Sequence, residues 1–216
     1  MRITIIGPNT SIPPKGWGAV ESLIWDYKIT LEKLGHVVQI INIGDPMRIL
    51  EMIEEFKPDF VHINYDDWVS LYPYIKYPCA VTTHFAYLER PEMMGPYKQR
   101  VFDVFGQIKP IVFGLSDSIN KVYQRDCGIS SDKLYLNPNG VMSDNFRVTK
   151  TPKFSDRSLF LAKVDSRKRQ SHFQSIDSLW YAGNIADSAF DQSKNYLGEW
   201  QKEYLYDNLT DYGNLV

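Results

Sequence analysis

The chain has 216 residues, which corresponds to one domain with a remainder or to two small domains. Lysine and arginine total 24 and aspartate and glutamate total 26, so the net charge of −2 indicates no nucleic-acid partner. Hydrophobic residues make up 44% of the chain, as in ordinary folded proteins. No apolar run of about 18–20 residues predicts a transmembrane segment, and no signal peptide is recognisable. We therefore expect a cytoplasmic protein, with Cys79 and Cys127 as buried thiols.

The first two thirds of the chain alternate between strand and helix patterns. Apolar, often β-branched runs predict six strands, at residues 3–6, 37–43, 60–63, 79–83, 111–115 and 134–136. Helical spacing predicts a helix over 20–34, a second after the N-cap Asp45, and a third capped by Ser116 or Asp117. Several strands are apolar on both faces, which is typical of a parallel sheet covered by helices on each side. Residues 1–146 are therefore predicted to form a Rossmann-like, doubly wound parallel sheet of the α/β class.

The remaining residues predict the beginning of a second α/β domain. Residues 147–157 are polar and are interpreted as a linker, and residues 158–216 as the incomplete second domain. Strands are expected at 159–164 and 180–183, with the basic run Arg167-Lys168-Arg169 between them. The apolar residues of the segment from Asn195 onward predict an amphipathic helix, and the last four residues look like the start of a strand.

Ligands of doubly wound sheets bind beyond the carboxyl ends of the strands, here after Ile6, Ile63, Thr83 and Leu115. Gly16 and Gly18 follow the first strand and precede the first helix, where free N–H groups attract phosphate. The loop is not the dinucleotide pattern G-x-G-x-x-G, because Glu21 occupies the third glycine position, and it is not a P-loop. A plain tight turn is the alternative interpretation.

Three motifs occur in order along the chain: Gly-Trp-Gly-Ala-Val-Glu at 16–21, Asn-Pro-Asn-Gly-Val at 137–141 followed by Phe146, and Leu-Ala-Lys-Val-Asp-Ser-Arg-Lys-Arg-Gln at 161–170. The first resembles the GG-x-E loop of family 4 glycosyltransferases of the GT-B fold. The second resembles the PNGVD…F motif of that family, and the third resembles its LGR-x-x-x-RKGQ segment. The resemblance runs over nearly the whole chain. It implies that the chain forms the N-terminal half of the GT-B fold and the start of the second GT-B domain.

The resemblance implies retaining transfer of a hexosyl group from a nucleoside diphosphate sugar to a hydroxyl of a glycan or another acceptor. It implies neither a metal nor a cofactor, because the nucleotide sugar is a co-substrate. Carried over by position, Gly16, Gly18, Lys163 and Lys168 would contact the donor phosphates. Lys163 replaces an arginine of the family pattern, and Ala162 and Arg169 replace glycines.

His84 follows the fourth strand and is the catalytic candidate, because enzymes of this kind often place a histidine against the transferred sugar. Trp17, Glu21 and Asp66 are the acceptor-binding candidates. Each candidate also has a structural interpretation. His84 would be a core histidine, Trp17 an exposed ring, Glu21 a partner of the helix dipole, Asp66 a helix N-cap, and the basic run a solvated turn.

The donor-site motif E-x7-E of the family is missing, since no two glutamates of the chain lie eight positions apart. We therefore expect a truncated glycosyltransferase with little or no activity alone. The alternative is a non-catalytic acceptor-binding or assembly module, with a homodimer or a partner chain covering an open sheet edge. An unrelated nucleotide-binding enzyme is disfavoured, because the dinucleotide fingerprint is absent.

Overall fold

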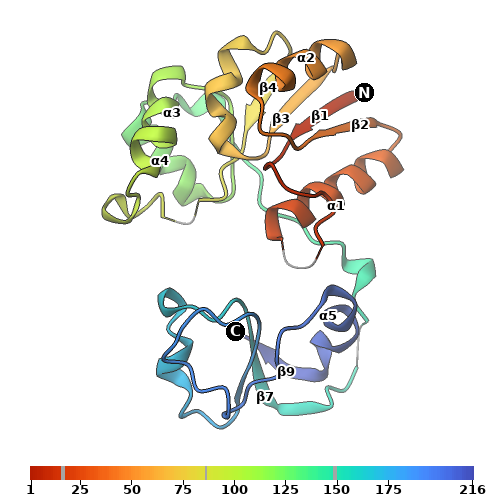
Figure 1. The fold of residues 1–216 in the computed structure, drawn as a ribbon, viewed down its shortest axis with the longest axis vertical. Helices are drawn as coiled ribbons and strands as arrows, with labels where there is room; N and C mark the ends of the chain where they lie inside the picture. The colour runs from red at the N-terminus through yellow and green to blue at the C-terminus, as the bar shows by residue number, and fades with distance from the viewer. Residues whose placement is uncertain (16–17, 86, 148–149) are drawn as a thin grey trace. The chain divides into compact units, whose positions relative to one another are not determined.

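The computed structural model describes residues 1–15, 18–85, 87–147 and 150–216. The chain forms two compact units, Met1–Val141 and Met142–Val216, which are called the first unit and the second unit below (Figure 1). Within the described residues, no helix is long and apolar enough to cross a membrane.

The first unit is built on a six-stranded parallel sheet with the order β2-β1-β3-β4-β5-β6. Its strands are β1 (Arg2–Ile6), β2 (Val37–Ile41), β3 (Phe60–Ile63), β4 (Cys79–Val81), β5 (Val112–Gly114) and β6 (Leu134–Leu136). The expected Rossmann-like α/β fold is confirmed. Three of the strands are one or two residues shorter at their ends than the apolar runs that predicted them.

Local capping chemistry sets the helix boundaries of the first unit. The helices are α1 (Ala19–Lys33), α2 (Pro46–Phe56), α3 (Asp103–Ile108) and α4 (Asp117–Cys127). The Asp45 carboxylate accepts from the N–H groups of the first turn of α2, and the Ser116 hydroxyl accepts from the N–H of Ile119 in α4. Helix α3 was not predicted, and the 3₁₀ helix Asp66–Tyr74 was expected only through the interpretation of Asp66 as a helix N-cap, because neither segment has a regular apolar period.

Helices cover both faces of this sheet. On one face, Ile5 and Val38 pack with Ile24 of α1. On the other face, Ile6 packs in a larger cluster that includes side chains of α2, α3 and α4. Ile5 and Ile6 are neighbours in β1 and both are buried, so the strand is apolar on both faces because each face has its own helical layer.

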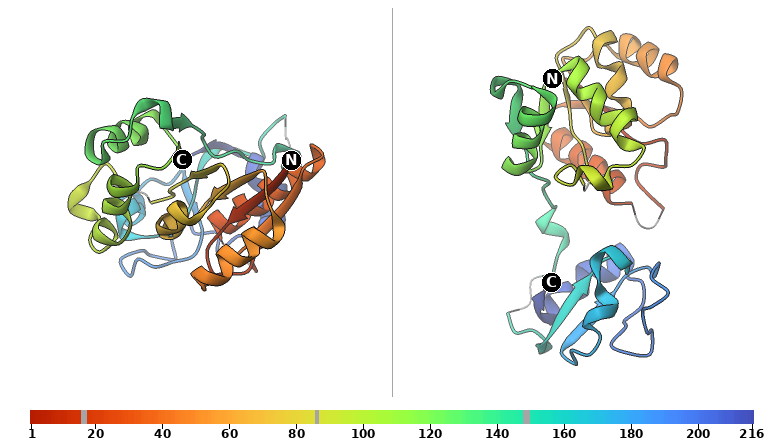
Figure 2. Two further views of the ribbon diagram at one scale, coloured as in Figure 1. Left: turned by 90° about the horizontal axis from the view of Figure 1, so that it is seen from above. Right: turned by 90° about the vertical axis from the view of Figure 1, so that its left-hand side faces the viewer.

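The second unit contains a parallel sheet with the order β8-β7-β9 and, among its described residues, the α-helix α5. Figure 2 shows this unit from two further directions. The elements are β7 (Phe154–Leu161), β8 (Leu179–Ala182), α5 (Lys202–Asn208) and β9 (Tyr212–Leu215). Helix α5 begins at Lys202, seven residues later than the predicted start near Asn195. The segment before it instead pairs with β8, where the Leu197 N–H donates to the Tyr181 carbonyl at 2.9 Å.

Strand β7 starts at Phe154, earlier than its apolar run predicted, because a polar segment is held by side-chain packing. The guanidinium group of Arg157 lies 4.6 Å from the centre of the Phe154 ring and 4.2 Å from that of Trp180. Arg147, at the start of the segment interpreted as a linker, donates to the Asp207 carbonyl and to the Asp211 carboxylate of the second unit. The described ends of this polar segment are thus packed within the second unit.

Candidate functional site

The strand order places a topological switch point between β1 and β3. All strands are parallel, so their carboxyl ends lie along one edge of the sheet. The chain leaves β1 toward β2 through α1, and it returns from β2 to β3 through α2 on the opposite face. Helices that diverge in this way leave a crevice at the edge of the sheet, which is where ligands of such sheets bind.

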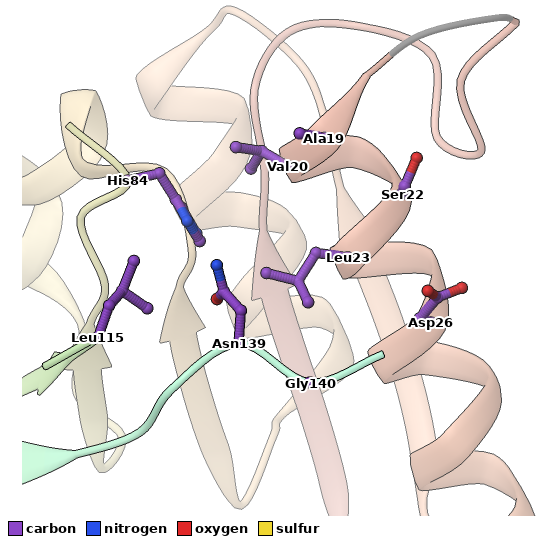
Figure 3. Close-up of a pocket in the computed structure, with 9 residues that line it drawn as sticks. All are labelled: Ala19, Val20, Ser22, Leu23, Asp26, His84, Leu115, Asn139 and Gly140. Atoms are coloured by element: carbon purple, nitrogen blue, oxygen red, sulfur yellow. The ribbon is translucent and has the colours of Figure 1, made fainter. Parts of the chain in front are cut away.

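A pocket of about 420 Å³ opens at this edge (Figure 3). In Figure 3, the side chains of His84, Asn139 and Leu23 point toward one another across the space beside α1. The pocket combines the first turns of α1 with the segments that follow β4, β5 and β6. Its lining residues are Ala19, Val20, Ser22, Leu23, Asp26, His84, Leu115, Asn139 and Gly140.

The pocket lies at the N-terminus of α1, where backbone N–H groups are free of intrahelical partners. The first such bond of the helix runs from the Ser22 N–H to the Gly18 carbonyl at 2.8 Å. The N–H groups of Ala19, Val20 and Glu21 precede it, and the N-cap Gly18 has no side chain to accept from them. The positive end of the helix dipole therefore lies beside a pocket whose wall includes Ala19, Val20 and, further along the helix, the carboxylate residue Asp26.

Gly18 is needed for space rather than for an unusual backbone conformation. Its φ of −172° is extended and open to any residue. A Cβ at this position would lie 2.8 Å from the Glu21 carboxylate and 2.9 Å from Pro14. Glu21 in turn accepts from the Thr10 hydroxyl at 2.9 Å, which ties the start of α1 to the loop after β1. Gly16 and Trp17 lie outside the described residues.

A second pocket, of about 290 Å³, adjoins the first and shares Val20 and His84 with it. Its other lining residues are Tyr65, Asp66, Asp67, Phe85, Tyr97 and Arg100. His84 thus stands at the border of two pockets. Its Nε2 atom lies 3.0 Å from the Asn64 side-chain oxygen, and burial lowers the pKa of His84. The ring is therefore neutral at neutral pH and can exchange hydrogen bonds with an uncharged ligand.

Asp66 is buried in the wall of the second pocket. Its Oδ2 atom accepts from the hydroxyl groups of Thr83 and Tyr97, which lie 3.1 Å from each other. Burial raises the pKa of Asp66, and the two hydroxyl donors oppose that shift. Tyr65 occupies the N-cap position of the 3₁₀ helix Asp66–Tyr74, so Asp66 is not the cap that one interpretation of the sequence suggested. The Tyr97 ring stacks on Phe85 with 3.7 Å between the ring centres.

Lys163 and Lys168 belong to the second unit, on the connection from β7 to β8. Both side chains are exposed. Lys168 ends a short 3₁₀ turn, Ser166–Lys168, which the Asp165 carboxylate caps by accepting from the Arg167 N–H at 2.9 Å. Arg169, at a position where the glycosyltransferase pattern that the sequence resembles has a glycine, has a left-handed backbone with a φ of 58°. The backbone here keeps a conformation that glycine adopts at lower cost.

The structure adds residues that the sequence did not single out. Asn64 contacts His84, and Tyr97 contacts Asp66, although they come from segments far apart in the chain. Asn139 was quoted only as part of a motif, yet it lines the first pocket. The expectation that ligands bind after the strand ends selected the segment after β3 but did not single out Asn64 within it. In the part of the chain that is described, no cluster of three or more His, Cys, Asp or Glu residues could hold a metal ion.

Neither a protein-family model nor a curated protein matches the chain. Solved structures do match. AviGT4, a glycosyltransferase involved in avilamycin A biosynthesis, shares 15% identity over 93% of this chain with a TM-score of 0.59. Anabaena Alr3699/HepE, solved in complex with UDP and glucose, shares 11% over 94% with a TM-score of 0.61. A glycosyltransferase from Rickettsia africae ESF-5 shares 14% over 95% with a TM-score of 0.59.

The chain spans 64%, 70% and 69% of the lengths of these three proteins, in the same order. At such low identity the likeness concerns the backbone and not the side chains that would carry an activity. The chain therefore has the α/β fold of these glycosyltransferases.

Proposed function

We propose that the first unit binds a saccharide at the border of its two pockets, as part of a site that transfers a sugar from a nucleoside diphosphate sugar to a hydroxyl acceptor. The observation that carries the proposal is the convergence of His84 and the α1 N-terminus on one pocket at the carboxyl edge of the sheet. Its volume of about 420 Å³ lies within the range of small-molecule sites. The complexes of Anabaena Alr3699/HepE with UDP and glucose support this ligand class.

The start of α1 suits the phosphate end of such a donor, and His84 suits its sugar end. The departing diphosphate gains negative charge during transfer, and the N–H groups at the start of α1 would stabilise that charge. As the resemblance implies, Gly16 and Gly18 would admit the phosphates close to the backbone, and Lys163 and Lys168 would pair with the phosphates. His84, which is neutral, would accept or donate a hydrogen bond at a sugar hydroxyl.

The second pocket would hold the acceptor. The carboxylate of Asp66 and the Tyr97 hydroxyl offer hydrogen-bond partners, and the aromatic face of Phe85 offers an apolar surface for a sugar ring. Trp17 and Glu21 remain proposed acceptor contacts. Family 4 membership, retention of configuration, independence from metals and a cytoplasmic location belong to the same proposal, and all four rest on the resemblance and on the composition.

Titration with UDP-glucose tests the proposal. Isotope-labelled protein is followed by NMR with UDP-glucose, UDP or glucose, for the wild type, His84→Ala and Asn139→Ala. The loss of one hydrogen bond should weaken UDP-glucose binding about fivefold in each variant. His172→Ala, which removes an exposed histidine of the second unit, should bind as the wild type does. If the resonances of the first unit do not change at the highest UDP-glucose concentration of the titration, the proposed saccharide site is refuted.

Measuring the release of UDP from UDP-glucose distinguishes catalysis from binding. We expect slow or undetectable release by the 216-residue chain, because its sequence lacks a pair of glutamates eight positions apart. Binding of an acceptor glycan without any transfer under all donor conditions would favour the alternative function, a non-catalytic acceptor-binding or assembly module. Rapid sugar transfer by the 216-residue chain, reduced by orders of magnitude in Lys168→Ala, would instead show that this chain is catalytically active by itself.

A further inference from the structure

A row of buried polar side chains connects the pocket to the centre of the sheet. The His84 Nε2 atom lies 3.0 Å from the Asn64 oxygen, and the Asn64 nitrogen lies 3.4 Å from the His62 Nε2 atom. The His62 Nε2 atom also lies 2.8 Å from the Thr82 hydroxyl. Asn64 is fully buried, and its backbone N–H donates to the Ile6 carbonyl at 2.9 Å. The amide is thus fixed at the switch point between β1 and β3.

An amide differs from a histidine in that its two ends cannot exchange roles. The Asn64 oxygen only accepts, so the His84 Nε2 atom that faces it must carry a hydrogen. The Asn64 nitrogen only donates, so the His62 Nε2 atom accepts, and its one lone pair is shared between the Asn64 amide at 3.4 Å and the nearer Thr82 hydroxyl at 2.8 Å. His84 is then protonated on Nε2 and His62 on Nδ1. One side chain imposes opposite tautomers on two histidines.

We propose that Asn64 is a positioning residue, which holds His84 protonated on Nε2 so that its Nδ1 atom accepts a hydrogen bond from a saccharide hydroxyl. This inference rests on the proposed function of the same pocket. Among the described residues, the structure records no partner for the His84 Nδ1 atom, while the ring itself lines both pockets. The opposite tautomer would present a donor there, and a hydroxyl would have to turn its oxygen toward the ring.

The surroundings of His84 are compatible with a neutral ring. The titratable side chains that line the same pockets are Asp26, Tyr65, Asp66, Asp67, Tyr97 and Arg100, and His62 lies beyond Asn64. Burial is the cause of the lowered pKa of His84, and Arg100 is paired with Asp67 at 3.0 Å. The hydrogen bond that the His84 Nε2–H donates to the Asn64 oxygen is therefore the directional contact that selects between the two neutral forms.

The tautomers are measured in the free protein by long-range ¹H–¹⁵N NMR of the histidine rings. We expect Nε2 protonation for His84 and Nδ1 protonation for His62. Asn64→Asp keeps an accepting oxygen and adds a charge, so it should raise the pKa of His84 by about one unit or more. Thr82→Val, which removes a partner of His62 alone, should leave the pKa of His84 unchanged. A wild-type His84 protonated on Nδ1, or an equal response to both variants, would overturn the proposal.

Ligand binding supplies the second test. Asn64→Leu should weaken UDP-glucose binding about fivefold when His84 is present. It should have no further effect in a His84→Ala background, because Asn64 acts through the His84 ring. Additive losses would refute a positioning role. A wild type that binds no UDP-glucose would refute the proposed function alone, since the tautomers of the free protein still decide what Asn64 does.

Discussion

Acidification should destabilise the first unit through His62, which is buried between aromatic side chains. Its ring lies 5.4 Å from that of Phe113 and 6.2 Å from that of Tyr27, measured between centres. Burial lowers the pKa of His62 from 6.5 to about 3. Between about pH 3 and pH 6.5, His62 binds a proton in the unfolded chain but not in the folded protein. The stabilising contribution is therefore complete above pH 6.5, and it is lost as the pH falls toward 3.

The size of the effect follows from the two pKa values. At pH 5 the loss relative to pH 7.5 is about 2 kcal/mol. With an ordinary urea dependence this shifts the unfolding midpoint of the first unit by roughly 1 M. His62→Gln keeps a hydrogen-bonding side chain but cannot take up a proton, so most of the difference between the two pH values should disappear in this variant.

The assay is urea unfolding at pH 7.5 and at pH 5.0, followed by NMR signals of β3, which report on the first unit alone. Asp66, with its raised pKa, and His84, with its lowered pKa, titrate in the wild type and in His62→Gln. Their contributions therefore cancel when the two proteins are compared. An equal pH response of the wild type and His62→Gln would refute the reasoning.

Three further predictions concern the second unit. Arg169→Gly should raise its free energy of unfolding by about 1 kcal/mol, because the left-handed backbone at that position costs a residue with a Cβ, and Arg169→Ala should show no such gain in urea titrations. Tyr181→Phe should be neutral or should stabilise the second unit by up to about 1 kcal/mol, because the buried Tyr181 hydroxyl has no hydrogen-bond partner in the described chain. Tyr196→Phe should instead destabilise the second unit by a similar amount, because it loses a 2.9 Å hydrogen bond to the Gly183 carbonyl. Gly183→Ala should unfold the second unit and leave the first folded, as judged by NMR dispersion, because the new Cβ would lie 2.1 Å from the Ala162 carbonyl oxygen.

Strong local signals in the sequence were enough for much of the first unit. The strands Phe60–Ile63 and Leu134–Leu136 have the predicted bounds, and α2 begins after the predicted cap Asp45. Apolar runs and caps act over a few residues, so they can be recognised without knowing the rest of the chain. The second unit gave weaker signals. Strand β7 begins in a polar segment, and α5 is shorter than its apolar pattern.

The sequence by itself determined the parallel sheet, and with it the edge at which a ligand would bind. It also supplied His84 and Asp66 as candidates at strand ends, because parallel strands bring all such ends to one side. Only the tertiary structure decided what these side chains contact. Asn64 reaches His84 across 20 positions of sequence and Tyr97 reaches Asp66 across 31. Contacts of that range follow from how strands and loops pack together, and no local pattern of residue types encodes them.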